Sequence, residues 1–356
     1  MHHRSRPRPR PHAARFAGAI VSLMFLAACS EKSPSPVAPP APRDISATFD
    51  KGNGQGNDND EVLDHAIIHP TIDGMDAFRA SHGNAATGAA ATAGANLTYH
   101  GGVGGIGVET SPRVYVVFYG SQWSNDPSGE ATLVQNFLRG VGGSSWLNSV
   151  TQYCQGVAVG TVQCGSSGTH AGNPANILIG VWFDNASAAP RRPSQSQLAA
   201  EAVRAANHFG NTTASSNVSS QYVIATAHGA NSSGFGSQYC AYHSSTSSTA
   251  GNVAYTNLPY ITDAGASCGA NFLNMGANAG VTIVGGHELA ETISDQFPNG
   301  GWLDSSGAEN GDKCAWISSG QGASAKITLS TGTFPVQTLW SNAFNGGAGG
   351  CVLSYP

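Results

Sequence analysis

The sequence predicts an α/β domain in which a mixed β-sheet is flanked by helices. Three runs rich in β-branched and aromatic residues are typical of buried strands, and they lie at 112–119, 176–183 and 221–227. Segments with a helical spacing of apolar residues alternate with them, at 130–139, 145–153 and 194–208. This order of elements favours a three-layer core.

The remainder of the domain is expected to be less regular. Residues 229–280 are rich in Gly, Ser and Asn and carry two cysteines, so we expect disulfide-tied loops there. A helix is expected around Val281 to Asp295. The C-terminal part is expected to form short antiparallel strands, at 325–329, 336–339 and 350–354.

Composition and charge exclude two broad classes of protein. Of the 356 residues, 40% are hydrophobic, which excludes a disordered chain. Lys and Arg number 16 against 21 Asp and Glu, for a net charge of −5. The chain therefore lacks the basic surface of a nucleic-acid binder, and we expect no nucleic-acid partner.

Residues 1–28 have the pattern of a bacterial lipoprotein signal peptide. Arginines from Arg4 to Arg15 precede an apolar run, 16–28, that is too short to span a membrane as a mature helix. Its end, Leu26-Ala27-Ala28-Cys29, resembles the lipobox in which the cysteine is lipidated. We therefore expect an exported protein, lipid-anchored through Cys29 to a bacterial membrane or cell surface. Ordinary signal cleavage beside a chance cysteine is the alternative.

Residues 29–96 are expected to be a largely disordered tether and lead-in. The Pro-rich stretch 30–43 and the Gly/Asn/Asp-rich stretch 51–60 contain too little apolar surface to offset the entropy of ordering. Residues 61–96 are expected to be a poorly ordered lead-in or a small pro-segment. The folded domain is expected to span residues 97–356.

The other six cysteines form an even set, as expected for an oxidising compartment, and allow up to three disulfides. Fifteen pairings are possible. Proximity in sequence favours Cys154 with Cys164, Cys240 with Cys268, and Cys314 with Cys351.

The motif that is most informative for chemistry is His287-Glu288-Leu-Ala-Glu291, within the helix expected at 281–295. Positions four apart lie on one helix face, so His287 and Glu291 can reach one ion, with Glu288 beside it. In the His-Glu-x-x-His motif of zinc peptidases, both histidines bind the metal and the glutamate activates water. Here Glu291 replaces the second histidine. We therefore predict a divalent metal, Zn²⁺ or a structural Ca²⁺, with Glu288 as the general base.

Further ligands must come from other parts of the chain. Glu309 and Asp312 lie next to Cys314 and are the best candidates, and His243 is a second possibility because Cys240 would anchor it. His228 follows an expected strand, where α/β sheets often carry functional groups.

Other readings of these residues compete with the metal site. The His-Glu-x-x-Glu pattern also suits a helix N-terminal turn, or a buried His–carboxylate pair that fixes a loop.

No Gly-x-Ser-x-Gly motif follows a strand and precedes a helix, so a serine hydrolase is not expected. Exposed tryptophans could stack on sugars; the candidates are Trp123, Trp146, Trp302 and Trp340.

Several motifs follow one another between Leu97 and Pro356 in a recognisable order. They comprise Leu97-Thr-Tyr-His100-Gly-Gly, Val114 to Gly120, Phe235 to His243, Leu258-Pro-Tyr260, Gly286 to Glu291, Trp302, Glu309-x-x-Asp312-x-Cys314 and Phe334 to Asn342. In order and spacing they resemble those of the EXORDIUM (phosphate-induced protein 1) family. This resemblance implies a secreted or wall-associated protein without an agreed catalytic activity. The lipobox and the Pro-rich tether depart from that family.

Two functions are compatible with these observations. The first is a surface-tethered, metal-dependent hydrolase of the peptidase type, acting on an extracellular or periplasmic polypeptide or a cell-envelope polymer. The second is a non-catalytic binding or structural lipoprotein, which includes a glycan binder. In both, the membrane is contacted only through the lipid anchor.

Overall fold

The computed structural model describes Leu63, residues 66–82 and residues 96–355. The expected signal peptide, the expected lipidation site Cys29 and the expected tether up to residue 60 lie outside the described residues. All that follows concerns the described part.

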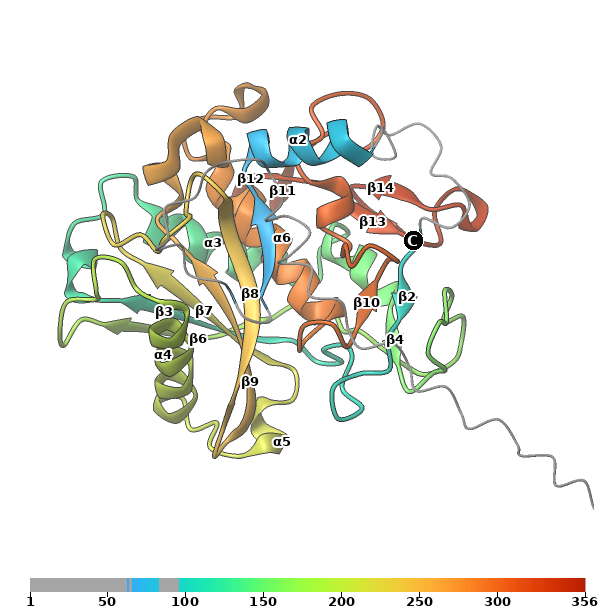
Figure 1. The fold of residues 1–356 in the computed structure, drawn as a ribbon, viewed down its shortest axis with the longest axis horizontal. Coiled ribbons are helices and arrows are strands. Elements are labelled where there is room, and N and C mark those ends of the chain that lie inside the picture. Colours follow the sequence, from blue (N-terminus) through green and yellow to red (C-terminus); the bar gives the residue numbers. More distant parts are fainter. Residues whose placement is uncertain (1–62, 64–65, 83–95, 356) are drawn as a thin grey trace, which may run out of the picture. The chain divides into compact units, whose positions relative to one another are not determined.

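A mixed sheet forms the centre of the fold (Figure 1). Within the described residues it has six strands in the order β1-β8-β9-β7-β3-β6. Neighbouring pairs are parallel from β6 through β3 and β7 to β9, whereas β8 is antiparallel to both β9 and β1. The strands are β1 (Ile67–Pro70), β3 (Arg113–Tyr119), β6 (Leu178–Asp184), β7 (Ser220–Thr226), β8 (Tyr239–Ser248) and β9 (Gly251–Leu258).

Strand β3 shows why helices cover both faces of the sheet. Val114, Val116 and Phe118 point into one apolar core, whereas Tyr115 and Val117 point into another. Successive side chains of a strand point to opposite faces, so a continuous apolar run needs cover on both sides.

Helices supply that cover. On one face lie α3 (Glu130–Val141) and α6 (Ala279–Ser294), and on the other lies α4 (Gln195–His208). The Ser194 hydroxyl accepts a hydrogen bond from the Gln197 N–H, which caps α4. The three-layer α/β fold predicted from the sequence is therefore confirmed. The other helical segments are α2 (Ile72–His82), α5 (Ala214–Asn217), η1 (Ser121–Ser124), η2 (Leu147–Gln152), η3 (Ile261–Cys268), η4 (Phe272–Asn274), η5 (Asp312–Cys314) and η6 (Asn345–Gly347).

The C-terminal part contains short antiparallel strands as expected, although the strand expected at 336–339 is instead the end of one strand and the start of the next. They are β11 (Ala325–Leu329) with β12 (Gly332–Val336), and β13 (Leu339–Ser341) with β14 (Gly350–Val352). Two further small pairs are β2 (Thr98–Tyr99) with β10 (Trp302–Leu303), and β4 (Cys154–Gln155) with β5 (Thr169–His170).

Two sequence-based expectations about organisation are wrong. Residues 229–280, expected to be loops, contain the β8–β9 hairpin, because many of its Ser and Thr residues lie in paired strands. The lead-in also contains regular structure, since β1 adds an edge strand to the sheet and α2 follows it. Folded structure thus begins before Leu97. The segment 145–153 is helical, but as the 3₁₀ turn η2.

All three favoured disulfides are present in the described part of the chain: Cys154–Cys164, Cys240–Cys268 and Cys314–Cys351. Such cross-links form in oxidising, extracellular environments. A search of the described residues finds no helix with the length and apolar character needed to cross a membrane.

Glu109 is a buried acid in the core, away from any other carboxylate cluster. Gln221 Nε2 donates to its Oε2 at 2.8 Å, and its Oε1 has no hydrogen-bond partner among the described residues. Burial raises the pKa of Glu109 to about 8, although Gln221 and Arg113 lower it. The folded chain therefore keeps a proton that the unfolded chain loses above about pH 4.5.

The free energy of unfolding should consequently fall as the pH rises from about 4.5 to about 8, and Glu109→Gln should remove this dependence. Each pH unit in that interval contributes about 1.4 kcal/mol, so the variant should gain roughly 3–5 kcal/mol over wild type. Urea unfolding of both proteins across this range measures the difference. A difference that stays constant with pH would contradict the assignment.

Candidate metal centre

Helix α6 carries the centre and is buried on nearly every side. Its side chains from Ala279 to Ser294 are buried apart from the half-buried Gly285. A helix that is apolar all round belongs in a protein interior, so the few polar groups on it need specific partners. His287, Glu288 and Glu291 are the ionisable groups on the helix, and each is at most 1% exposed.

The first group of side chains joins α6 to η5. His287 Nε2 lies 2.9 Å from Glu291 Oε1 and 3.6 Å from Asp312 Oδ1. The Asp312 backbone N–H donates to Glu291 Oε1 at 2.9 Å, and the Cys314–Cys351 disulfide ties this turn to β14. His287, Glu291 and Asp312 thus offer three ligand atoms within 4.8 Å of one another.

Gln337 fixes the orientation of the His287 ring. Its Nε2 donates to the Gly311 carbonyl at 2.7 Å and to the Thr338 carbonyl at 3.2 Å, so its Oε1 faces His287 Nδ1 at 3.1 Å. Because an amide oxygen only accepts, Nδ1 must carry the proton. The other ring nitrogen, Nε2, then faces Glu291 and Asp312, and it can share a proton with these carboxyl groups or bind a cation. A hydrogen bond of this kind orients many metal-binding histidines.

His243, from β8, forms a second group with Glu309. Its Nε2 lies 2.6 Å from Glu309 Oε2 and 3.8 Å from Glu291 Oε2. Burial lowers the pKa of His243 to about 4, although Glu291 raises it. Glu291 lies between this pair and His287, because its two oxygens approach Nε2 of both histidines.

A third histidine, His69 of β1, packs directly on His287. The two rings are parallel, with an interplanar angle of 3° and centroids 3.9 Å apart. Neither ring nitrogen of His69, nor either oxygen of Glu288, has a hydrogen-bond partner within the described ranges. His69, His287 and Glu288 form another group with ligand atoms within 4.8 Å. Burial, and then His287, lowers the pKa of His69 well below its ordinary value, so this ring is neutral.

The centre is dominated by buried carboxyl groups. Burial raises the pKa of Glu288 well above its ordinary range, with Glu291 and Asp312 adding to the shift and His287 opposing it. Burial and Glu291 raise the pKa of Asp312 to about 8. Burial lowers the pKa of His287, but attraction to and a hydrogen bond with Glu291, together with the charges of Glu288 and Asp312, outweigh this and bring the pKa to about 10. A bound cation would stabilise the charged carboxylates and replace the second proton of His287.

Of the site residues predicted from the sequence, six lie in or beside the candidate metal centre and one, His228, lies elsewhere. His287, Glu288, Glu291, Asp312, Glu309 and His243 lie together. His228 lies at the end of β7 and is 45% exposed, with its Nδ1 2.5 Å from Asp263 Oδ1. Sequence analysis missed His69 and Gln337, whose only local signals are a histidine in a short apolar run and a glutamine beside a strand.

The tryptophans considered for sugar stacking cannot do so from the surface. Trp123, Trp146, Trp302 and Trp340 are all buried in the main core.

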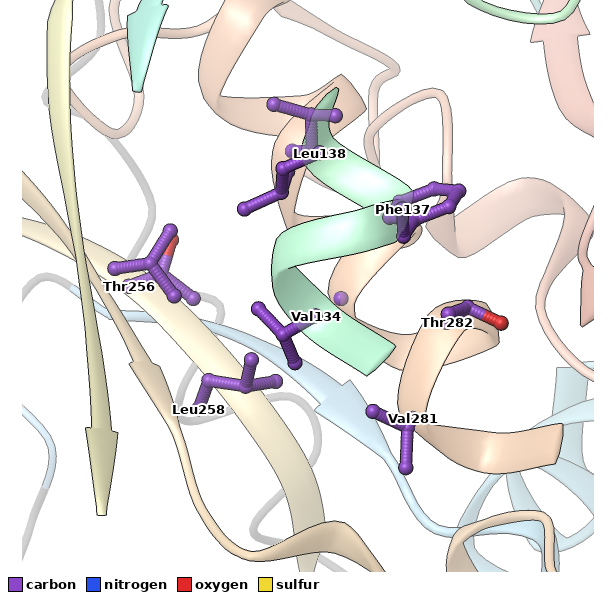
Figure 2. A pocket seen from close by; sticks show the side chains of 10 residues that line it. Val134, Phe137, Leu138, Thr256, Leu258, Val281 and Thr282 are labelled. Atoms are coloured by element: carbon purple, nitrogen blue, oxygen red, sulfur yellow. The ribbon is translucent and has the colours of Figure 1, made fainter. Parts of the chain in front are cut away.

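Figure 2 shows an apolar pocket between α3, α6 and β9, lined by residues such as Val134, Leu258 and Val281. Its volume of about 10 Å³ holds at most one water molecule, so it is a packing gap and no ligand site.

Comparison of the chain with protein-family models, with curated proteins and with solved structures gives no match. The resemblance to the EXORDIUM family stays an expectation, since none of these comparisons bears on it. Function is therefore argued from the residues of the centre.

Proposed function

We propose that the protein is a metal-dependent hydrolase of the peptidase type, in which His287, Glu291 and Asp312 hold a divalent cation. One observation carries this proposal: the Nε2 of His287, oriented by Gln337, lies 2.9 Å from Glu291 Oε1 and 3.6 Å from Asp312 Oδ1, with all three side chains buried. The ligand atoms that His287, Glu291 and Asp312 offer lie within 4.8 Å of one another, a spacing that suits a single metal ion.

The donor set favours zinc over calcium. Calcium takes oxygen ligands, whereas imidazole nitrogen suits zinc and other transition metals. A bound zinc ion supplies Lewis acidity and lowers the pKa of a coordinated water. Glu288 follows His287 directly, and its two carboxylate oxygens have no hydrogen-bond partner among the described residues. It is therefore the group that can accept a proton from the attacking water.

Cleavage of polypeptides is tested with the purified protein, denatured protein substrates and peptide libraries analysed by mass spectrometry. We expect cleavage that a chelator abolishes and that added Zn²⁺, but not Ca²⁺, restores. The absence of cleavage under every metal condition, including prolonged incubation, would reject the hydrolase. The complete burial of the centre favours a structural ion as the second candidate, and that candidate predicts bound metal without cleavage.

Gly311 allows η5 to pack closely on the centre. A methyl group there would lie 2.7 Å from His287 Nδ1 and 2.8 Å from Glu291 Oε1. We therefore expect Gly311→Ala to lower the zinc affinity about 10–100-fold, the usual scale for groups that orient ligands. In Gly285→Ala, the control on α6, the methyl meets only Leu258, at 3.8 Å. Competition with a chromophoric chelator measures both, and equal affinities would contradict this role of residue 311.

We also propose that the protein is held on the membrane through lipid on Cys29. The arginine-rich, apolar and Leu-Ala-Ala-Cys order supports this anchor. Stable anchoring takes two or more acyl chains, and on this proposal Cys29 is the residue that carries them. Cys29→Ala should therefore move the protein from the detergent phase to the aqueous phase in detergent partitioning. Unchanged partitioning of this variant would exclude the lipid anchor.

A further inference from the structure

The side chains of the proposed centre are buried in the described part of the chain, and β1 is one of the elements that cover them. His69 covers one face of the His287 ring and lies beside Glu288. Figure 1 shows β1 running alongside β8 and next to α6. A hydrolase needs its general base to meet a substrate, so an element that covers Glu288 must move or be replaced.

Strand β1 and helix α2 are held on the domain by backbone pairing with β8 and by apolar side chains that enter its cores. Ile67 packs on Leu303, and the Trp316 indole N–H donates to the Pro70 carbonyl at 2.9 Å. From α2, Met75 enters the main core and the Arg79 guanidinium donates to the Ala315 carbonyl. The rest of the sheet, from β8 to β6, is paired without this segment.

Release of β1 would make β8 the edge strand of the sheet. The pairing of β1 with β8 runs from Ile67 opposite His243 to Pro70 opposite Tyr239. Unpaired backbone groups along such an edge bind an extended peptide by adding it as a further strand. A peptide in this place would run past His243 and present one residue over His287, where His69 now lies.

We propose that the edge of β8 between Tyr239 and His243 is the binding site for an extended polypeptide substrate, and that residues 66–82 occupy it in the full chain as an internal inhibitor. The catalytic half of this inference rests on the proposed function, whereas peptide binding to β8 does not. His69 is the blocking group, because its ring covers one face of His287 and lies beside Glu288, in the space that a substrate residue would need.

The variant Ile67→Asp tests this by placing a charge in the contact with Leu303 while leaving β8 and α6 unchanged. Its matched control is Ile179→Asp, at a 49% exposed position on β6, the opposite edge of the same sheet. A fluorescent peptide copying residues 66–71, Ala-Ile-Ile-His-Pro-Thr, reports on the β8 edge by anisotropy. Hydrogen exchange at 239–243 shows whether β1 has been released, and exchange in α6 shows whether the domain is still folded.

We expect Ile67→Asp to bind the peptide at least about tenfold more tightly than wild type or Ile179→Asp, because a larger fraction of chains has an open edge. Hydrolysis of unfolded protein should rise by a similar factor. If hydrogen exchange shows that β1 is still paired in Ile67→Asp, a second variant is used. It carries a protease site inserted between His82 and Asn96, so that β1 and α2 can be cut from the chain and removed.

The outcomes are distinct. Peptide binding without hydrolysis supports the β8 site and rejects the proposed peptidase. Hydrolysis by the intact chain that does not rise on release of β1 rejects the inhibitor role. A folded domain that has lost β1 and binds no peptide overturns the inference as a whole.

Discussion

Glu288→Gln is expected to retain one equivalent of metal and to hydrolyse peptides about 10²–10⁴-fold more slowly than wild type, the usual scale for loss of a general base. The amide has nearly the same shape as the carboxylate but cannot accept the proton of the attacking water. The metal content should not change, because the proposed ligands are His287, Glu291 and Asp312.

Glu109→Gln is the matched control for this change. It also replaces a fully buried glutamate by its amide, but outside the groups of potential metal ligands. We expect it to keep the wild-type rate. Rates for Glu288→Gln equal to those of wild type would remove Glu288 from the mechanism, even if the metal is present.

His287→Ala is expected to lose both the metal and all metal-dependent cleavage. It removes the nitrogen ligand of the proposed centre, and it leaves Glu291 and Asp312 as two buried carboxylates without a cation between them. Elemental analysis after dialysis, together with the peptide assay, measures both effects.

His228→Ala provides the control, because this histidine is exposed and pairs with Asp263 away from the centre. It should keep both the metal and the activity. Retention of a full equivalent of zinc by a folded His287→Ala protein would show that the ion is held elsewhere.

The parts of the fold that could be predicted are those whose signal is local. The apolar run at 112–119 and the amphipathic pattern at 194–208 each indicate their secondary structure within a few residues. The structure confirms both, as β3 and α4. The three disulfides followed from sequence proximity. His287 and Glu291 were expected to meet because one helical turn separates them, a distance that the sequence specifies by itself.

What could not be predicted depends on contacts between distant segments. Strand β1 has only four residues, and its burial comes from pairing with β8, which lies far along the chain. His69 therefore gave no signal of its position over His287. Gln337 likewise acts through tertiary structure, since its amide is held by the Gly311 and Thr338 carbonyls. The choice between Glu309 and Asp312 also needed the fold, which pairs Glu309 with His243 and brings Asp312 to His287.

The most direct test of the metal centre is X-ray diffraction from crystals of the zinc-loaded protein, with anomalous scattering recorded at the zinc edge. The structure predicts an anomalous peak about 2.0–2.2 Å from His287 Nε2 and from carboxylate oxygens of Glu291 and Asp312. The Nδ1 of His287 should still donate to Gln337. A map with no peak at this position, in which His287 Nε2 instead donates a proton to Glu291, would contradict the proposal of a metal enzyme.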